Sequence, residues 1–218
     1  MKGSLSVREA ARKLGIHRNT AFRFRHLMMP APARHQPDSL PGIAEADEAF
    51  FRLSFKGAKS DMPRKAFKRG SSASKRGIST GQVAVLTAVS TGFRNSHITV
   101  LPSTPTAAAI AAALSPVVKP DTVLCSDSAR AYKAAAKAMG VSVRQIPSGS
   151  YKLGPYHIQN VNALHSRIKG WLHPFKGVAT KYLPAYLSWF RFFDQASNEV
   201  KPRQFLLDAF GVPTTNAI

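Results

Sequence analysis

Acidic residues are scarce in this chain, and two of them stand where a metal ion could bind. The 218 residues include 31 Lys and Arg but only 11 Asp and Glu. Asp47 lies beside Glu45 and Glu48 in a segment that predicts a strand, and Asp127 ends the apolar run TVLCSD. Side chains alternate along a strand, so Asp47 shares a face with Glu45 while Glu48 points the other way. Because ligands collect at the carboxyl ends of strands in open sheets, both aspartates are candidate metal ligands. A helix cap before SARAYK is the alternative role of Asp127.

A predicted helix, HIQNVNALHSRIKGWLHPF, supplies further polar candidates. Asn162 and Lys169 are seven residues apart, which is two helical turns on nearly the same face. An amide and an ammonium so aligned could meet one phosphate, whereas the alternative is a solvated helix face. His157, His165 and His173 recur every eight residues, but that period drifts around a helix, and no cysteine supports it. We therefore reject a zinc site.

The elements that would position these residues form a recognisable order. Three strands come first, and helices then alternate with two further strands before the Asn162 helix. Such an order predicts an α/β fold, a mixed sheet flanked by helices. The strands are predicted in AEADEAFFRLSF, GQVAVLTAVS, HITVLPS, TVLCSD and VSVRQIPS, and the helices between them in TPTAAAIAAALSPVV and SARAYKAAAKAMG.

The first 29 residues predict a small helix-turn-helix. Ser6 stands three residues before Glu9, a capping-box spacing, and Gly15 separates two runs of helical periodicity. The expected apolar faces are Val7, Ala10, Ala11 and Leu14 in the first helix and Ala21, Phe24, Leu27 and Met28 in the second. The start of the second helix could read a major groove, through Arg18, Asn19, Thr20 and Arg23. A plain helical hairpin with a basic face is the alternative.

Charge and composition favour nucleic acid as the partner. The formal net charge is +20 and is spread along the chain, as expected for a protein that binds a polyanion. No apolar stretch reaches the roughly 20 residues of a membrane span. The single cysteine, Cys125, excludes an intramolecular disulfide, and no signal segment follows Met1, so we expect a cytoplasmic protein.

Two irregular segments divide the chain. Residues 30–42 are rich in proline and predict a linker. Residues 55–77 carry many cations and predict either a solvated loop or, as we favour, an arm that tracks phosphates. Its candidate DNA-binding residues are Lys65, Lys68, Arg69, Lys75 and Arg76.

Taken in order, several segments resemble the insertion-sequence family fifteen-ninety-five of bacterial transposases. These are DEAFFRLSFKG, KRGSSASKRGISTGQV, the Asp127 strand, YHIQNVNALHSRIKGWL and GVATKYLPAYLSWF. The resemblance runs from the helix-turn-helix to about residue 193. After the helix-turn-helix at 1–29 and the linker at 30–42, it implies a ribonuclease-H-like catalytic domain at 43–193, and the tail at 194–218 lies outside the resemblance.

The resemblance also implies a chemistry. Asp47, Asp127 and Asn162 match the catalytic triad of the transposase branch that has Asn in place of Glu, and Lys169 matches a lysine that contacts DNA. Asp47, Asp127 and Asn162 would hold two Mg²⁺ (or Mn²⁺) ions, and the site would catalyse cleavage at the ends of an insertion sequence and strand transfer into target DNA. A homo-oligomer is implied, because two DNA ends must be processed together.

The chain departs from this family at its start. Such transposases usually carry a cysteine-bearing zinc ribbon before the helix-turn-helix, and this chain lacks those cysteines. We therefore expect a short copy, and a truncated remnant that only binds DNA is the alternative function.

Overall fold

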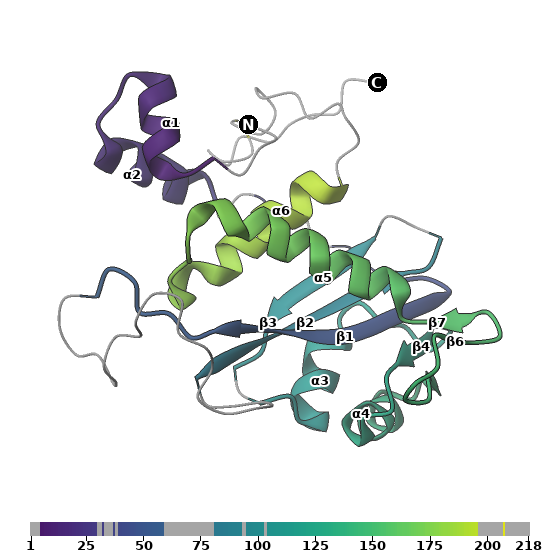
Figure 1. Cartoon of the computed structure of the whole chain (residues 1–218). Helices are drawn as coiled ribbons and strands as arrows, with labels where there is room; N and C mark the ends of the chain where they lie inside the picture. The colour runs from purple at the N-terminus through teal and green to yellow at the C-terminus, as the bar shows by residue number, and fades with distance from the viewer. Residues whose placement is uncertain are drawn as a thin grey trace, which may run out of the picture.

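The computed structural model describes residues 5–29, 32, 37, 39–58, 81–92, 95–102, 104–195 and 207. Figure 1 shows a central sheet with helices on both faces and a helix pair beside it. The strands are β1 (Ile43–Arg52), β2 (Gln82–Ser90), β3 (Ser96–Val100), β4 (Val123–Ser126), β5 (Ser142–Gln145), β6 (Lys152–Leu153) and β7 (Tyr156–His157). The helices are α1 (Val7–Leu14), α2 (Arg18–Met28), α3 (Ala107–Leu114), α4 (Arg130–Met139), α5 (Gln159–Leu172) and α6 (Leu183–Gln195), with short 3-10 turns at His173–Phe175 and Thr180–Tyr182.

The main sheet has the order β3-β2-β1-β4-β5. Strands β1, β2 and β3 form an antiparallel meander, whereas β4 pairs in parallel with both β1 and β5. The parallel pairings require crossovers, which α3 and α4 provide. The predicted ribonuclease-H-like mixed sheet, flanked by helices and preceded by a small helix pair, is confirmed.

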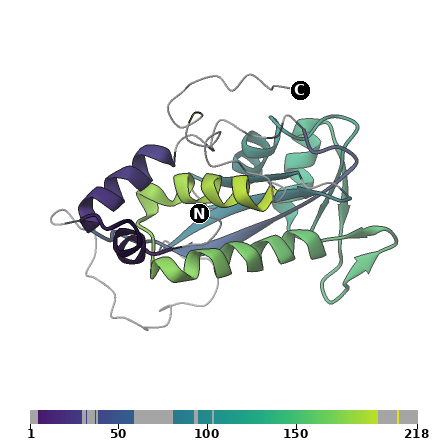
Figure 2. The same cartoon turned by 90° about the horizontal axis from the view of Figure 1, so that it is seen from above.

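Each face of the sheet has its own apolar core, because side chains alternate along the strands. Ala46 and Leu86 pack with α3 and α4 on one face, whereas Val85 packs with α5 and α6 on the other. Helix α5 crosses directly over β1 and β2 (Figures 1 and 2). Its buried side includes Leu164 and Ile168, which leaves its remaining surface for polar chemistry.

The Ser6 cap and the break at Gly15 that the sequence predicts are present. The Ser6 hydroxyl accepts a hydrogen bond from the Glu9 N–H at 3.2 Å. Gly15 and Gly140 end α1 and α4 with φ of 63° and 69°, a left-handed conformation that glycine adopts without strain. The sequence did not predict α6 or the β6–β7 hairpin.

The predicted apolar face of α2 is only partly right. Ala21 is buried, but Phe24 and Leu27 are 50% and 61% exposed. The side of α2 that contacts α6 and the turn after α5 instead carries Arg25, with Met29 at the helix end, and both pack with aromatic residues there. Hydrophobic periodicity does not predict this face, because its buried residue is an arginine.

Candidate active site

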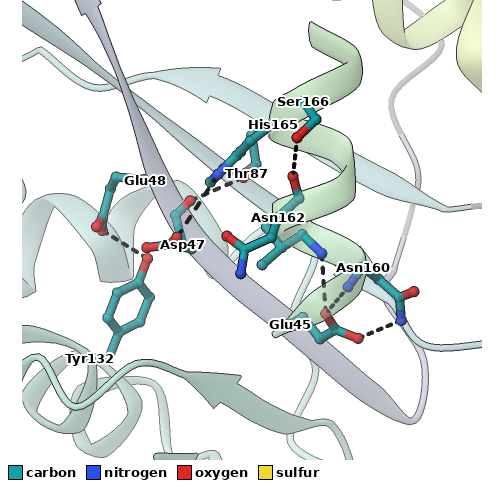
Figure 3. Close-up of polar contacts among 10 residues, drawn as sticks. Glu45, Asp47, Glu48, Thr87, Tyr132, Asn160, Asn162, His165 and Ser166 are labelled. Carbon is teal, nitrogen blue, oxygen red and sulfur yellow. Dashed lines mark hydrogen bonds and ion pairs between the residues drawn. The ribbon is translucent and has the colours of Figure 1, made fainter. Parts of the chain in front are cut away.

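Asp47 lies in the middle of β1, on the face that α5 covers. Its neighbour across the sheet is Thr87, which donates a hydrogen bond from Oγ1 to the Asp47 carbonyl at 3.0 Å. Oγ1 of Thr87 lies 2.6 Å from Nε2 of His165, and Nδ1 of His165 lies 3.9 Å from Oδ2 of Asp47 (Figure 3). Thr87 and His165 therefore fix the strand and the helix on either side of Asp47.

The hydrogen-bond roles determine how His165 meets the carboxylate. Because Thr87 gives its hydrogen to the Asp47 carbonyl, its oxygen accepts the Nε2–H of His165. Burial, followed by the positive charge of Lys169, lowers the pKa of His165 to about 4, so the ring is neutral at pH 7. Nδ1 thus turns a lone pair towards Asp47, and a proton or a cation between them would suit both groups.

The surroundings of Asp47 disfavour its negative charge. Burial raises the pKa of Asp47 to about 6, and the charge of Asp127 contributes to the rise, while the backbone N–H of Glu48 and the charge of Lys169 act in the opposite direction. The charges of three predicted site residues, Asp47, Asp127 and Lys169, therefore interact with one another.

Asp127 follows β4, which is hydrogen-bonded beside β1. Its Oδ1 accepts a hydrogen bond from the Ala129 N–H at 3.0 Å. Gln145 donates to the carbonyls of Asp127 and Ala129, which fixes the same turn. The carboxylate therefore holds the turn before α4, but α4 itself has no side-chain cap. This turn contact employs one carboxylate oxygen and is compatible with metal binding through the other.

Asn162 and Lys169 are both exposed on α5. Figure 3 shows the Asn162 side chain on the side of α5 that faces β1 and Asp47. Lys169 acts electrostatically on both Asp47 and His165, as the pKa values of these residues indicate. An amide and an ammonium therefore border the carboxylates from the helix side.

A buried carboxylate, Glu45, positions the start of α5. It is fully buried, and its Oε2 accepts hydrogen bonds from the backbone N–H groups of Asn160 at 2.8 Å and Val161 at 3.1 Å. Its Oε1 accepts from Asn160 Nδ2 at 2.5 Å and Thr91 Oγ1 at 3.0 Å, and lies 3.2 Å from His157 Nδ1. A carboxylate suits the positive end of a helix dipole. Glu45 thereby sets the position of Asn162, one residue further along.

Glu48 points to the opposite face of the sheet, as the alternation predicted. It accepts a hydrogen bond from the Tyr132 hydroxyl at 2.7 Å. Burial raises its pKa to about 7; the Tyr132 bond opposes the rise, and the charges of Asp47 and Asp127 add to it. Glu48 therefore lies beneath the site as a carboxyl group that is only partly ionised at pH 7.

The sequence missed the roles of Glu45 and His165. The eight-residue recurrence groups His157 and His165 with His173, but the first two approach different carboxylates of β1: His157 is beside Glu45 and His165 beside Asp47. The sequence signal was the alternation of Glu45 with Asp47 on one strand face, which places two carboxylates against one helix.

The predicted DNA-binding residues fall into two groups. On α2, Arg18, Asn19 and Arg23 are exposed and Thr20 is half-buried. Residues Lys65, Lys68, Arg69, Lys75 and Arg76 lie outside the described part of the chain.

The donor set fits a hard divalent cation. Two carboxylates and an amide oxygen are ligands that Mg²⁺ prefers, and a cation would favour the ionised form of Asp47, whose pKa is raised by burial and, to a smaller extent, by the charge of Asp127. Across the described ranges, there is no group of three or more His, Cys, Asp or Glu side chains that could hold a metal. The candidate ligand set that the sequence predicts is Asp47, Asp127 and the amide of Asn162.

Comparison with known proteins places this site in context. The family model of the ISXO2-like transposase domain matches residues 39–193. Comparison with curated proteins finds no match.

Solved structures with similarity include the catalytic core of BIV integrase, with a TM-score of 0.39 and 15% identity over 67% of this chain and 81% of the integrase chain. A simian T-cell lymphotropic virus intasome has a TM-score of 0.40 and 11% identity over 84% of this chain and 61% of that chain. A pre-cleavage Mos1 transpososome has a TM-score of 0.29 and 12% identity over 89% and 75%. Within the described residues, no helix is both long and apolar enough to cross a membrane.

Proposed function

Because this chain belongs to the family of ISXO2-like transposase domains, we propose that it cleaves DNA at the ends of an insertion sequence and joins the freed strand to target DNA. The observation that carries this proposal is the convergence of β1, β4 and α5. Asp47 lies on the central strand, Asp127 follows the adjacent strand, and Asn162 and Lys169 lie on the helix that covers them.

Asp47, Asp127 and Asn162 would hold two Mg²⁺ or Mn²⁺ ions. When bound, such ions activate water and stabilise the leaving oxygen of a phosphodiester. The neutral amide of Asn162 would provide an oxygen without adding a fourth carboxylate to a cluster that already contains those of Asp47, Glu48 and Asp127.

The protein's own groups orient the reacting phosphate. Lys169 provides a positive charge beside Asp47 and would contact a DNA phosphate. Thr87 and His165 restrict Asp47, while Glu45 restricts the start of α5, so the ligands on the strand and on the helix keep a fixed separation. Preorganisation of this kind lowers the entropy lost when the phosphate is bound.

The partners follow from the reaction. DNA would supply both the element ends and the target, and coordinated cleavage at two ends requires at least two copies of the protein, so we propose a homo-oligomer working on DNA in the cytoplasm. Arg18, Asn19, Thr20 and Arg23 on α2 would contribute to DNA binding.

The test is a nicking assay on supercoiled plasmid with and without Mg²⁺. Asp127→Asn should reduce nicking to background, because it removes a carboxylate that binds the ions. Asp121→Asn is the matched control, since Asp121 is an exposed carboxylate in the turn before the same strand.

Binding and cleavage should separate in this assay. Without metal, Asp127→Asn should bind DNA as well as the wild-type protein or slightly better, because one charge that repels phosphate is gone. Undiminished nicking in Asp127→Asn would refute the catalytic assignment. Plasmid binding by wild-type protein that never nicks would instead support a remnant that only binds DNA.

A further inference from the structure

A basic groove lies between the helix pair and the catalytic domain. It has a volume of about 890 Å³ and runs between α1, α2 and the segment that joins α5 to α6. Figure 2 shows these parts side by side at one end of the molecule. The described residues along its wall include six Arg or Lys and no Asp or Glu, namely Arg8, Arg18, Arg25, Lys56, Lys176 and Lys181.

One of these cations maintains the groove itself. Lys56 donates hydrogen bonds from Nζ to the carbonyls of Phe175, Lys176 and Gly177, at 3.3, 3.2 and 2.8 Å. It therefore ties the loop after β1 to the turn after α5. The exposed cations Arg8, Arg18, Lys176 and Lys181 leave the groove strongly positive.

The same groove has an aromatic wall. Phe22 is 39% exposed; its ring centroid lies 4.0 Å from that of His26 and 6.1 Å, edge-on, from that of Tyr182. Lys181 places its Nζ 4.9 Å from the centre of the Tyr182 ring. Aromatic surface therefore adjoins positive charge within one groove.

Two groups in the wall lack a hydrogen-bonding partner among the described residues. Arg25 is only 8% exposed; its Nη2 donates to the Leu5 carbonyl at 2.7 Å, but its Nη1 has no partner there. Nε2 of His26 is likewise unpaired within that part of the chain, but Nδ1 of the same ring donates to the Phe22 carbonyl, so Nε2 of the neutral ring is an acceptor. The unsatisfied N–H in this wall is that of Arg25, and because an unsatisfied N–H of a buried cation is costly, an anion beside it would stabilise this arrangement.

We propose that this groove binds a single strand of DNA, with phosphates against its cations and an unpaired base against the Phe22–Tyr182 wall. Single-strand sites combine a positive track with aromatic rings on which bases stack. A duplex keeps its base faces stacked internally, so it could use the cations but not the rings. This proposal rests on the proposed function in one respect only, namely that DNA cleavage in the active site would supply the single strand.

The position of the groove suits a strand that leaves the active site. Asn162 and Phe175 are 13 residues apart, and a helical rise of about 1.5 Å per residue places them roughly 20 Å apart. That distance corresponds to about six steps of a B-form duplex at roughly 3.4 Å each, and to fewer nucleotides of an extended single strand. Lys169 lies between them on α5, so positive charge continues from the catalytic residues to the groove.

Fluorescence anisotropy with a labelled oligothymidylate of about twelve nucleotides tests the proposal, because single-strand sites span roughly 4–16 nucleotides. A duplex of equal length is measured in parallel. Phe22→Leu keeps an apolar side chain but removes the ring, and should weaken single-strand binding about 5- to 150-fold, as stacking energies predict. Phe24→Leu is the control, since Phe24 is exposed on the same helix but does not line the groove.

The contribution of the cations is measured separately, from the salt dependence of the affinity. Lys181→Gln should flatten the dependence of log affinity on log salt by about 0.7 for one lost phosphate contact on a single strand. Arg12→Gln is the control, because Arg12 is exposed on α1 outside the groove.

The outcomes separate this inference from the proposed function. Equal effects of Phe22→Leu and Phe24→Leu, or equal loss of duplex and single-strand binding in Phe22→Leu, would overturn the inference. An unchanged salt slope in Lys181→Gln would also overturn it. Failure of the wild-type protein to nick plasmid would refute the catalytic proposal without altering these affinities, which need neither Mg²⁺ nor cleavage.

Discussion

Removing the carboxylate of Glu45 should destabilise the fold far more than neutralising it. Glu45 is fully buried, and its Oε2 accepts two backbone N–H groups at the start of α5. In Glu45→Ala these donors lose their acceptor, and each buried donor without a partner costs about 1–3 kcal/mol. The free energy of unfolding should therefore fall by about 2–6 kcal/mol, a large part of the roughly 5–15 kcal/mol that stabilises a typical domain.

Glu45→Gln should be milder because the two oxygens have different partners. The groups around Oε1 can reverse their roles: the Asn160 amide can rotate, the Thr91 hydroxyl can accept, and Nδ1 of His157 can accept. The backbone N–H groups around Oε2 can only donate. The glutamine should therefore direct its oxygen to the helix and its NH₂ group to the other side, at a cost of about 1–2 kcal/mol for the weaker, uncharged hydrogen bonds.

Urea unfolding followed by circular dichroism measures both variants. Glu48→Gln provides a control on the same strand, because Glu48 accepts one hydrogen bond from Tyr132 and its burial already raises its pKa to about 7. That substitution should change the free energy of unfolding little at pH 7. Equal destabilisation by Glu45→Ala and Glu45→Gln would refute the reasoning, since it would mean that the charge, and not the backbone acceptor, holds α5.

Three further outcomes are expected. Affinity for duplex DNA, measured by anisotropy, should fall roughly 10³- to 10⁵-fold between about 50 and 200 mM salt if 6 to 10 phosphates are contacted, and a flat response would contradict DNA binding by the +20 surface. In calorimetry, Asn162→Glu should bind Mn²⁺ more tightly than wild type, and Asn162→Ala should bind it more weakly. Equal affinities in all three proteins would mean that Asn162 is only a solvated residue on the helix face. Burial, followed by the charge of Arg191, lowers the pKa of His97 to about 4, so between about pH 6.5 and 4 the unfolded chain binds a proton that the folded protein does not. As the pH falls through that window, the free energy of unfolding of wild type should decrease relative to that of His97→Gln by about 1.4 kcal/mol per pH unit. A difference between the two proteins that does not change with pH would contradict the lowered pKa of His97.

The sequence predicted the sheet and two of its carboxylates because those features are local. Acidic residues are rare here, so the placement of Asp47 in one strand and Asp127 after another was informative on its own. The order of strands and helices then restricted the topology, and parallel pairing of β4 with β1 placed the strand before Asp127 next to that of Asp47.

The contacts that position the site are long-range, and no local pattern reports them. Glu45 and the start of α5 are separated by 115 residues in the chain, so nothing near Glu45 shows that its carboxylate serves a helix. Arg25 likewise packs over Phe175 and Trp189, and its burial on α2 depends on residues about 150 positions away. Hydrophobic periodicity treats an arginine as a solvent-facing residue and therefore misplaced the docking face of α2.

The electrostatics of the site explain how the fold can accommodate this cluster of carboxylates without a metal ion. Burial and mutual repulsion raise the pKa values of Asp47 and Glu48 to about 6 and 7, so these carboxylates already resist ionisation. A glutamate at position 162 would add another negative charge beside Asp47, and only Lys169 opposes that charge from the helix. The amide of Asn162 would provide a ligand oxygen without this repulsion. Asn in place of Glu at position 162 therefore stabilises the metal-free site but weakens its attraction for cations. Bound DNA phosphate would have to supply the missing negative charge.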